Sequence, residues 1–349
     1  MSDKFISRFL ILATVTLVLL YLVVLAGSVV RASGSGMGCP DWPKCFGYYI
    51  PPTDPWQVEF HPNEQYEKGR MIISNDTLWR AVHDFTSGVS FDRTHWEKYP
   101  KHNYAKFVVY QTWTEYINRL LGLLSGLSLL ILSLFSLRFW NKDRVVVWAL
   151  IFAFVMILFV SWLGAVVVET NLKPVSITLH MASALIMIGV VIYTQSRVQL
   201  KFRQVSRIAI PSTLYYALTG ALLLTIAQVY FGTQVRQQID TIKNNMDGLS
   251  RETWIDQLNN GYWVHIIIGG AALLLNTFAV YQFVKNHAST SRIKRLALCI
   301  GLIVWGTYGA GVLMHKFAIP AFVQPVHLLF AVILFGLQFA LIIRSTKKA

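Results

Sequence analysis

Two histidines, His265 and His327, each lie a few residues inside one end of a strongly apolar segment. Ionisable groups inside an apolar span are costly, so they are functional candidates by default. Two imidazoles that face one another at one depth of a helix bundle are the usual frame for a six-coordinate haem iron. Small residues at positions 269–272 would leave room for a flat macrocycle. The alternative is a pair of unrelated helix-end histidines that bond to backbone groups.

A second set of polar residues combines Glu115, Asn118 and Arg119 with His180. Glu115 and Asn118 are three residues apart and share one helix face. A carboxyl group near the membrane edge is suited to proton transfer, whereas its structural alternative is an ion pair with Arg119 or Arg31. Arg119 would hold a haem propionate or a lipid headgroup. Since Asn is a poor ligand for haem iron, His180 alone would leave the sixth position of an iron open.

The cysteines divide into a pair and a single residue. Cys39 and Cys45 flank the sequence Pro-Asp-Trp-Pro-Lys in a predicted loop. A short closed loop that faces an oxidising compartment favours a disulfide, which would either brace the loop or take part in redox chemistry. Cys299 lies within an apolar run and is interpreted as a small core residue.

The elements that position these residues are membrane-spanning helices. Residues of the AVILMFWYC set make up 54% of the chain and charged residues only 14%, about half the share in soluble proteins. A hydrocarbon core about 30 Å thick requires roughly 20 apolar residues per helix. Eight runs qualify: Phe9–Val30, Leu120–Leu137 (with a helix start near Phe107), Val145–Val168, Pro174–Ser196, Ile208–Val235, Gln257–Val284, Leu296–Met314 and Phe317–Ile343. The sequence therefore predicts an all-α polytopic membrane protein with both termini on one side of the bilayer.

The formal net charge of +14 indicates orientation. The termini and the loops on their side carry 16 basic and two acidic residues, whereas the opposite side carries 14 of each. Because Lys and Arg accumulate on the cytoplasmic side, both termini are expected in the cytoplasm. A nucleic-acid ligand is not expected, since nucleic-acid binders concentrate positive charge on a soluble face.

The first apolar run also bears on localisation. It is 22 residues long and has no clear small-x-small cleavage site, so it is expected to be retained as a helix. No Arg- and Ser-rich transit segment precedes it, which favours a bacterial plasma membrane.

An internal repeat relates the two halves of the chain. The pattern G-[ST]-x-V-R occurs at Gly27–Arg31 and again at Gly232–Arg236. Further residues recur at constant offsets, in the pairs Asn118 with His265, Gly122 with Gly269, Gly164 with Gly311, and His180 with His327. Four helices per repeat restore the membrane orientation, so we expect two parallel four-helix bundles related by a pseudo-two-fold axis. The first bundle is expected at 1–200 with a long outer loop at 31–106, and the second at 201–349 with an outer loop at 236–256.

With these motifs the chain resembles the haem A synthase family. The resemblance rests on G-S-V-V-R-A-S-G-S-G-M-G-C-P-D-W-P-K-C at Gly27–Cys45, T-W-T-E-Y-I-N-R-L at Thr112–Leu120, the segment Asn171–His180, Gly232–Arg236, and His265 with His327. It covers essentially the whole chain and is specific in combination.

The resemblance implies an oxidoreductase that oxidises the C8 methyl group of haem O to a formyl group, giving haem A for terminal cytochrome oxidases. It implies a substrate haem in the first bundle and a permanent haem b, which passes electrons, in the second. By position, His265 and His327 would ligate the iron of haem b, and His180 the iron of the substrate haem.

Further roles follow from the same resemblance. Glu115 would be the essential acid, and Cys39 with Cys45 the redox-sensitive pair. Arg31 and Arg236, at equivalent outer helix ends, are candidates for contacts with haem propionates.

One position departs from the family pattern. Many members have Glu-x-x-His in the second helix, whereas this chain has Asn118 as the fourth residue. A five-coordinate haem on His180 would then leave the iron open, with Asn118 as a hydrogen-bond donor over the open position. A ligand from the long outer loop is the alternative, from among His61, His83, His95 and His102.

Two other classes of function compete with this interpretation. One is a di-haem b electron-transfer subunit of the membrane without substrate chemistry, and the other is a transporter built on the parallel repeats. On family grounds, a haem O synthase (a farnesyltransferase) is expected to supply the substrate. The sequence does not identify the membrane electron donor, and it leaves assembly as a homo-oligomer open.

Overall fold

The computed structural model describes residues 1–99, 106–169, 174–245, 251–286 and 291–348. Eight helices in these ranges are long and apolar enough to cross a membrane. They are α1 (Asp3–Ser33), α2 (Val109–Ser136), α3 (Arg144–Glu169), α4 (Pro174–Phe202), α5 (Ser212–Asn245), α6 (Asn260–Asn286), α7 (Ser291–Lys316) and α8 (Val323–Ile343). The protein is a multi-pass membrane protein, and the predicted helical class with eight spans is confirmed.

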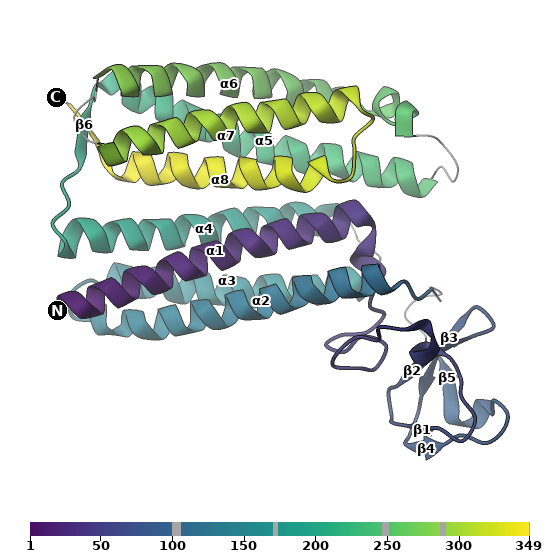
Figure 1. Cartoon of the computed structure of the whole chain (residues 1–349). Coiled ribbons are helices and arrows are strands. Elements are labelled where there is room, and N and C mark those ends of the chain that lie inside the picture. Colours follow the sequence, from purple (N-terminus) through teal and green to yellow (C-terminus); the bar gives the residue numbers. More distant parts are fainter. Residues whose placement is uncertain (100–105, 170–173, 246–250, 287–290, 349) are drawn as a thin grey trace.

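The eight helices lie in two groups of four, α1–α4 beside α5–α8 (Figure 1). Within each group, successive helices pack against one another and the last helix packs back against the first. The groups meet through α1 and α4 on one side and through α8 and α5 on the other. The pseudo-two-fold relation between the groups and the domain boundaries at 1–200 and 201–349 stay predictions.

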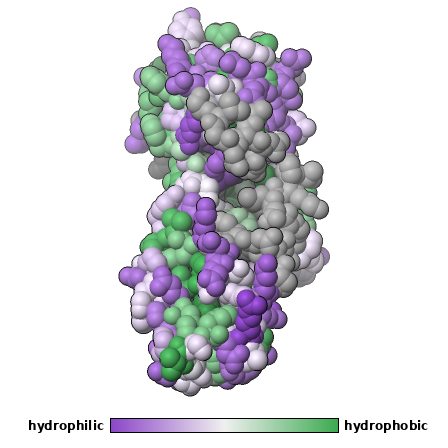
Figure 2. All heavy atoms as spheres, turned by 90° about the vertical axis from the view of Figure 1, so that its right-hand side faces the viewer, coloured by the Kyte–Doolittle hydropathy of each residue, from purple (hydrophilic) through white to green (hydrophobic). Residues whose placement is uncertain are grey.

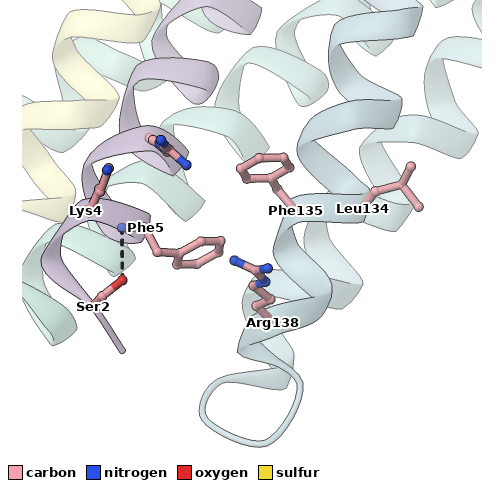
Figure 3. A pocket seen from close by; sticks show the side chains of 7 residues that line it. Ser2, Lys4, Phe5, Leu134, Phe135 and Arg138 are labelled. Atoms are coloured by element: carbon pink, nitrogen blue, oxygen red, sulfur yellow. Dashed lines mark hydrogen bonds between the residues drawn. The ribbon is translucent and has the colours of Figure 1, made fainter.

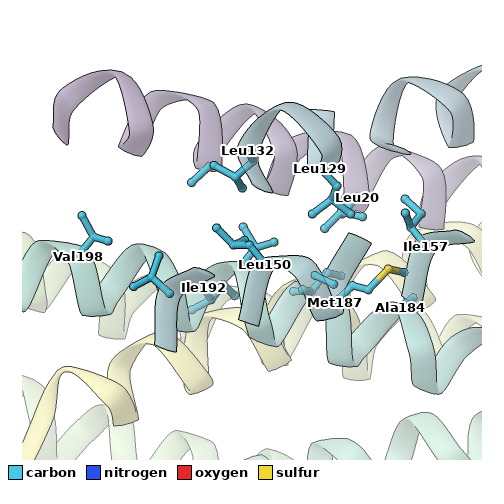
Figure 4. Close-up of a cluster of buried hydrophobic side chains, with 14 of the residues drawn as sticks. Leu20, Leu129, Leu132, Leu150, Ile157, Ala184, Met187, Ile192 and Val198 are labelled. Carbon is cyan, nitrogen blue, oxygen red and sulfur yellow. The ribbon is translucent and has the colours of Figure 1, made fainter. Parts of the chain in front are cut away.

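The core of the first group is built from apolar side chains of all four helices (Figure 4). Leu20 of α1, Leu132 of α2, Leu150 of α3 and Ile188 of α4 are at most 2% exposed. In a bilayer, such helices associate by close packing and by hydrogen bonds between them. Large apolar side chains on the outer surfaces, such as Leu302, remain exposed and are suited to face lipid.

The long outer loop folds into a small β-rich domain that the sequence analysis did not predict. The strands β2 (Met71–Ser74), β3 (Thr77–Ala81) and β5 (Trp96–Lys98) form one antiparallel sheet, and β1 (Gln65–Tyr66) pairs with β4 (Phe85–Thr86). Strands of two to five residues give too short a period-2 pattern to be recognised. Viewed from this outer end, hydrophilic residues cover much of the second group, whereas the loop domain carries a hydrophobic area (Figure 2).

Helix α5 differs from the predicted fifth span at both ends. Residues Ile208–Ile210 form strand β6, which pairs in parallel with β7 (Ser345–Lys347), and the helix begins only after Pro211. At its other end α5 continues to Asn245, so the first half of the predicted outer loop 236–256 is helical. The β6–β7 pair ties the connection between the two groups to the C-terminal segment.

Both termini lie at one end of the molecule (Figure 1). Asp143, in the connection between α2 and α3, forms ion pairs with Arg197 and Lys201 of α4. The buried carboxylate of Asp143 accepts hydrogen bonds from Arg197 Nε at 2.8 Å and from Lys201 Nζ at 3.1 Å. Burial by itself would raise the pKa of Asp143, but the hydrogen bonds and charges of Arg197 and Lys201 outweigh it and hold the pKa below its ordinary value.

We predict that Asp143→Asn lowers the free energy of unfolding by about 2 kcal/mol, because Arg197 and Lys201 lose a charged acceptor. The midpoint of thermal unfolding in detergent checks this. Since the native pKa is depressed, the stabilisation is present above about pH 4 and is lost as the pH falls through the native pKa. Asp3→Asn is the matched control, because Asp3 is exposed. Equal midpoints for the two variants would contradict the prediction.

Candidate functional site

In the second group, His265 of α6 and His327 of α8 lie opposite one another. Their ring centroids are 6.2 Å apart and the ring planes are inclined by 68°. The two histidines that were predicted to face each other across this bundle are therefore together in the structure.

The two rings differ in their partners. Nδ1 of His327 lies 2.9 Å from the carbonyl oxygen of Thr307 on α7. Because only a protonated Nδ1 can donate to a carbonyl, Nε2 is left as the ligating atom, the arrangement typical of metal-bound histidines. Nδ1 of His265 is buried and has no hydrogen-bond partner among the described residues. Gln228 of α5 donates to the carbonyl oxygen of His265 at 2.6 Å.

Glycines of the neighbouring helices make room for both rings. A Cβ atom on Gly232 of α5 would lie 3.3 Å from Cε1 of His265, and one on Gly311 of α7 would lie 3.4 Å from Cε1 of His327. A side chain at either position would press directly on an imidazole. The repeat predicted these glycines, and the structure shows that they cradle the histidines.

This arrangement fits an iron held by two axial imidazoles. Two imidazoles bound to one metal ion through bonds of about 2 Å place their ring centres roughly 6 Å apart, and the observed separation is 6.2 Å. The buried Nδ1 of His265 without a partner and the two glycine cradles agree with a ligand at this place. The residues present therefore fit a haem.

In the first group, glycines of neighbouring helices lie beside Asn118 and His180 in the same way, so that Asn118 stands where the second group has His265. A Cβ atom on Gly27 of α1 would lie 3.6 Å from Oδ1 of Asn118, and one on Gly164 of α3 would lie 4.0 Å from Cε1 of His180. Oδ1 of Asn118 is buried and has no hydrogen-bond partner among the described residues. Asn118 thus takes the place against α1 that His265 takes against α5.

The carboxylate of Glu115 is buried and paired. Its Oε1 accepts a hydrogen bond from Nη2 of Arg119 at 2.6 Å, and its Oε2 accepts one from the backbone N–H of Cys39 at 2.9 Å. The ion pair that the sequence analysis held as the structural alternative is therefore present. The hydrogen bond from the N–H of Cys39 to Glu115 also joins α2 to the disulfide loop.

Arg119 fixes the disulfide loop more widely. Its Nη1 donates to the carbonyl oxygens of Asp41 at 2.8 Å and Lys44 at 3.0 Å, so its contacts are with protein groups. The predicted disulfide between Cys39 and Cys45 is present. The loop also approaches α2 closely, because a Cβ atom on Gly38 would lie 2.6 Å from the backbone of Gln111.

Asp41 is an acid of this loop that the sequence analysis did not single out. Burial raises the pKa of Asp41, and the hydrogen bond from the N–H of Gly47 and the charge of Arg119 offset that rise only in part. Besides Glu115 of α2, a second carboxyl group, that of Asp41, therefore lies close to Arg119. Its position inside the C-P-D-W-P-K-C segment was the available signal.

The two arginines of the repeat motif, Arg31 and Arg236, meet at one carboxylate between the groups of helices. Nε of Arg31 lies 2.9 Å from Oδ2 of Asp240, and Nη2 of Arg236 lies 2.7 Å from Oδ1 of Asp240. Arg236 also donates to the carbonyl oxygen of Arg31 at 3.0 Å and to the side chain of Gln324. Two cations share one anion, so the cluster keeps a positive charge that suits a propionate; that contact stays a prediction.

Asp240 was not predicted from the sequence, although its spacing of four residues from Arg236 on a helix was a signal. A polar contact between the two groups near the candidate sites was not predicted either. Thr178, two residues before His180, accepts from Gln237 at 2.9 Å and lies 3.2 Å from the hydroxyl of Thr233. Thr233 directly follows the glycine that cradles His265.

The loop histidines that were held as alternative ligands have partners of their own. His61 stacks on Trp56 with 3.9 Å between ring centroids, and His83 and His95 are joined by a hydrogen bond of 2.9 Å. All three lie in the β-rich loop domain. His102 and residues 171–173 of the quoted motif lie outside the described residues.

Comparison with known proteins decides the family. The family model described as cytochrome oxidase assembly protein, COX15-CtaA, matches residues 10–83 and 77–339. The chain belongs to this family. A haem A synthase of Shewanella oneidensis is 24% identical over 247 residues, which make up 71% of this chain and 62% of that protein. This chain thus aligns with less than two thirds of the length of that relative.

We predict that Arg119→Gln makes the Cys39–Cys45 disulfide roughly ten times more rapidly reducible by dithiothreitol, because the loop loses its bonds to α2 and opens locally. With Cys299 alkylated beforehand, time-resolved reduction and mass spectrometry measure the rate. Arg80→Gln, which removes an ion pair with Glu97 inside the loop domain, is the matched control. Similar rates in both variants would show that Arg119 does not hold the loop.

Proposed function

We propose that this protein is a haem A synthase, which oxidises the C8 methyl group of haem O to a formyl group. The observation that carries the proposal is the opposed pair His265 and His327 in a chain of this family, together with the glycine contacts of these histidines, which recur at Asn118 and His180. The name of the Shewanella oneidensis relative supports the same activity.

In this proposal His265 and His327 hold haem b in the second group, and the bound haem supplies electron transfer. The protein orients both imidazoles. The carbonyl oxygen of Thr307 fixes the ring of His327 through a hydrogen bond, Gly232 leaves room for the ring of His265, and Gly311 leaves room for the ring of His327. His180 would hold the substrate, with Asn118 across from it as a neutral polar group.

Oxidation of a methyl group to a formyl group removes four electrons and adds one oxygen atom. A first hydroxylation gives the alcohol, a second gives the gem-diol, and the gem-diol loses one water to leave the formyl group. With dioxygen as the oxidant, each hydroxylation also takes up two electrons from the membrane donor and two protons and releases one water, so protons must be delivered near the substrate. Glu115 lies on the same helix face as Asn118, so we assign it to proton transfer there. Its bonds from Arg119 and from the N–H of Cys39 keep the carboxylate in place.

We further infer the setting in the cell. The basic excess on the terminal side supports cytoplasmic termini and a bacterial plasma membrane, and in that orientation the candidate sites would lie near the outer face. A haem O synthase would supply the substrate, a membrane electron donor would supply electrons, and self-association is compatible with the exposed helix surfaces. The di-haem electron-transfer subunit is the less favoured function, because the named relative is a synthase.

We predict that Glu115→Gln lowers haem A formation at least about 100-fold, the lower end of general acid–base contributions, while the haem b spectrum persists. Cells supplied with haem O are extracted, and haem O and haem A are quantified by chromatography and mass analysis. Glu97→Gln is the control, because Glu97 lies in the loop domain away from α2. Unchanged haem A production by Glu115→Gln would refute the assignment.

We predict that His265→Ala and His327→Ala each abolish the reduced haem b spectrum of the purified protein, because each removes a side chain that would hold the haem iron. Difference spectroscopy with iron analysis measures this. His315→Ala, which removes a histidine bonded to Tyr262 at the outer end of α7, is the control and should keep the spectrum. An unchanged spectrum in either ligand variant would overturn the haem b site.

A further inference from the structure

A pocket opens between the start of α1 and the end of α2 (Figure 3), at the end of the molecule that holds both termini. Its volume is about 360 Å³. The lining residues are Ser2, Lys4, Phe5, Arg8, Leu134, Phe135 and Arg138. Neither the haem sites nor the proposed reaction uses this pocket.

The pocket combines three cations with two aromatic rings. Lys4, Arg8 and Arg138 line it, and no ion pair with an acidic residue occurs for them within the described parts of the chain. The guanidinium of Arg138 lies 5.1 Å from the ring centroid of Phe5, and Phe5 stacks on Phe135 with 6.0 Å between centroids. Arg138 is thus held over an aromatic floor with its donors available.

The N-terminal end of α1 adds to the positive potential of the three cations. The pocket lies at the N-terminus of α1, where backbone N–H groups carry the positive end of the helix dipole. Ser2 caps this helix through a bond from the N–H of Phe5. Asp3 is an acid of the first turn, but it is not among the residues that line the pocket. The local balance therefore favours an anion.

Exposed apolar side chains continue from the pocket along both helices. On α1, Ile11, Val15 and Val18 follow Arg8 at helical spacing and are 64%, 47% and 51% exposed. On α2, Ile131 and Leu127 precede Leu134 at the same spacing and are 46% and 47% exposed. Residues three and four apart share a helix face, so each helix presents an apolar stripe that leads away from the cations toward the membrane centre.

Tryptophans mark the level of the pocket. Trp140, two residues after Arg138, is 39% exposed and lies 5.8 Å from Trp148 between ring centroids. Exposed Trp side chains gather at the interface between hydrocarbon and headgroups. Trp140 therefore suits this interface, where the nearby cations of the pocket would meet lipid phosphates.

We propose that this pocket binds an anionic phospholipid, with its phosphate between Lys4, Arg8 and Arg138 and its acyl chains along α1 and α2. Basic pockets between helices on the positively charged side of a membrane protein recognise lipid headgroups in this way. A bound lipid would join the ends of α1 and α2, the first two helices of the group that carries Asn118 and His180.

The test compares the wild type with a variant that carries Lys4→Gln, Arg8→Gln and Arg138→Gln. The matched control carries Lys285→Gln, Lys294→Gln and Lys348→Gln, which removes three cations from the same side of the second group. Native mass spectrometry of the detergent-solubilised full chain is titrated with phosphatidylglycerol, with phosphatidylcholine, and with inorganic phosphate as a competitor. Thermal midpoints confirm that all three proteins are folded.

We expect the pocket variant to bind phosphatidylglycerol roughly tenfold or more weakly than the wild type and the control, and phosphatidylcholine to bind all three alike. Equal affinity of the pocket variant and the control for phosphatidylglycerol would overturn the site. Displacement of the lipid by millimolar inorganic phosphate would show a free-anion site and overturn the lipid assignment.

Discussion

A bilayer offers no hydrogen-bond partner to polar groups, and the rest of this structure depends on that constraint. Polar side chains inside the spans pair with one another, as Gln338 does with Asn276 at 2.7 Å and Thr16 with Ser128 at 2.6 Å. Against this background a buried polar atom without a described partner is informative. Nδ1 of His265 and Oδ1 of Asn118 are two such atoms, at matched positions of the two groups of helices.

The same constraint explains which features were predictable. Spans and the polar residues within them can be predicted from composition and spacing, and the eight helices and the facing of His265 and His327 are present. The disulfide was predicted from the short spacing of Cys39 and Cys45 and is present as well. The β-rich loop domain and the sharing of Asp240 by two arginines were not predicted. They depend on contacts between residues far apart in the sequence, in aqueous segments where hydrophobic periodicity says little.

Glu115 shows how two interpretations of one residue can both hold. The ion pair with Arg119 is present, yet it does not remove the carboxyl group from the candidate site, because Asn118 lies on the same face of α2. A carboxylate in an apolar setting needs such partners to remain charged. Arg119 pairs with Glu115 and also donates to the carbonyl oxygens of Asp41 and Lys44 in the disulfide loop. The proposed role of Glu115 and the position of the loop therefore both depend on the guanidinium of Arg119.

Contacts at both ends of the helices hold the two groups in register. At the outer end, Asp240 joins Arg31 of one group to Arg236 of the other, and Thr178 meets Gln237. At the terminal end, Arg344, which directly follows α8, donates to Gln199 of α4 at 2.6 Å. In the proposed function, electron transfer between two haem sites would require a fixed separation, and contacts between the groups at both ends of the helices are suited to hold it. The glycines beside the histidines and the polar contacts between the groups would then meet one requirement, a constant geometry between the two sites.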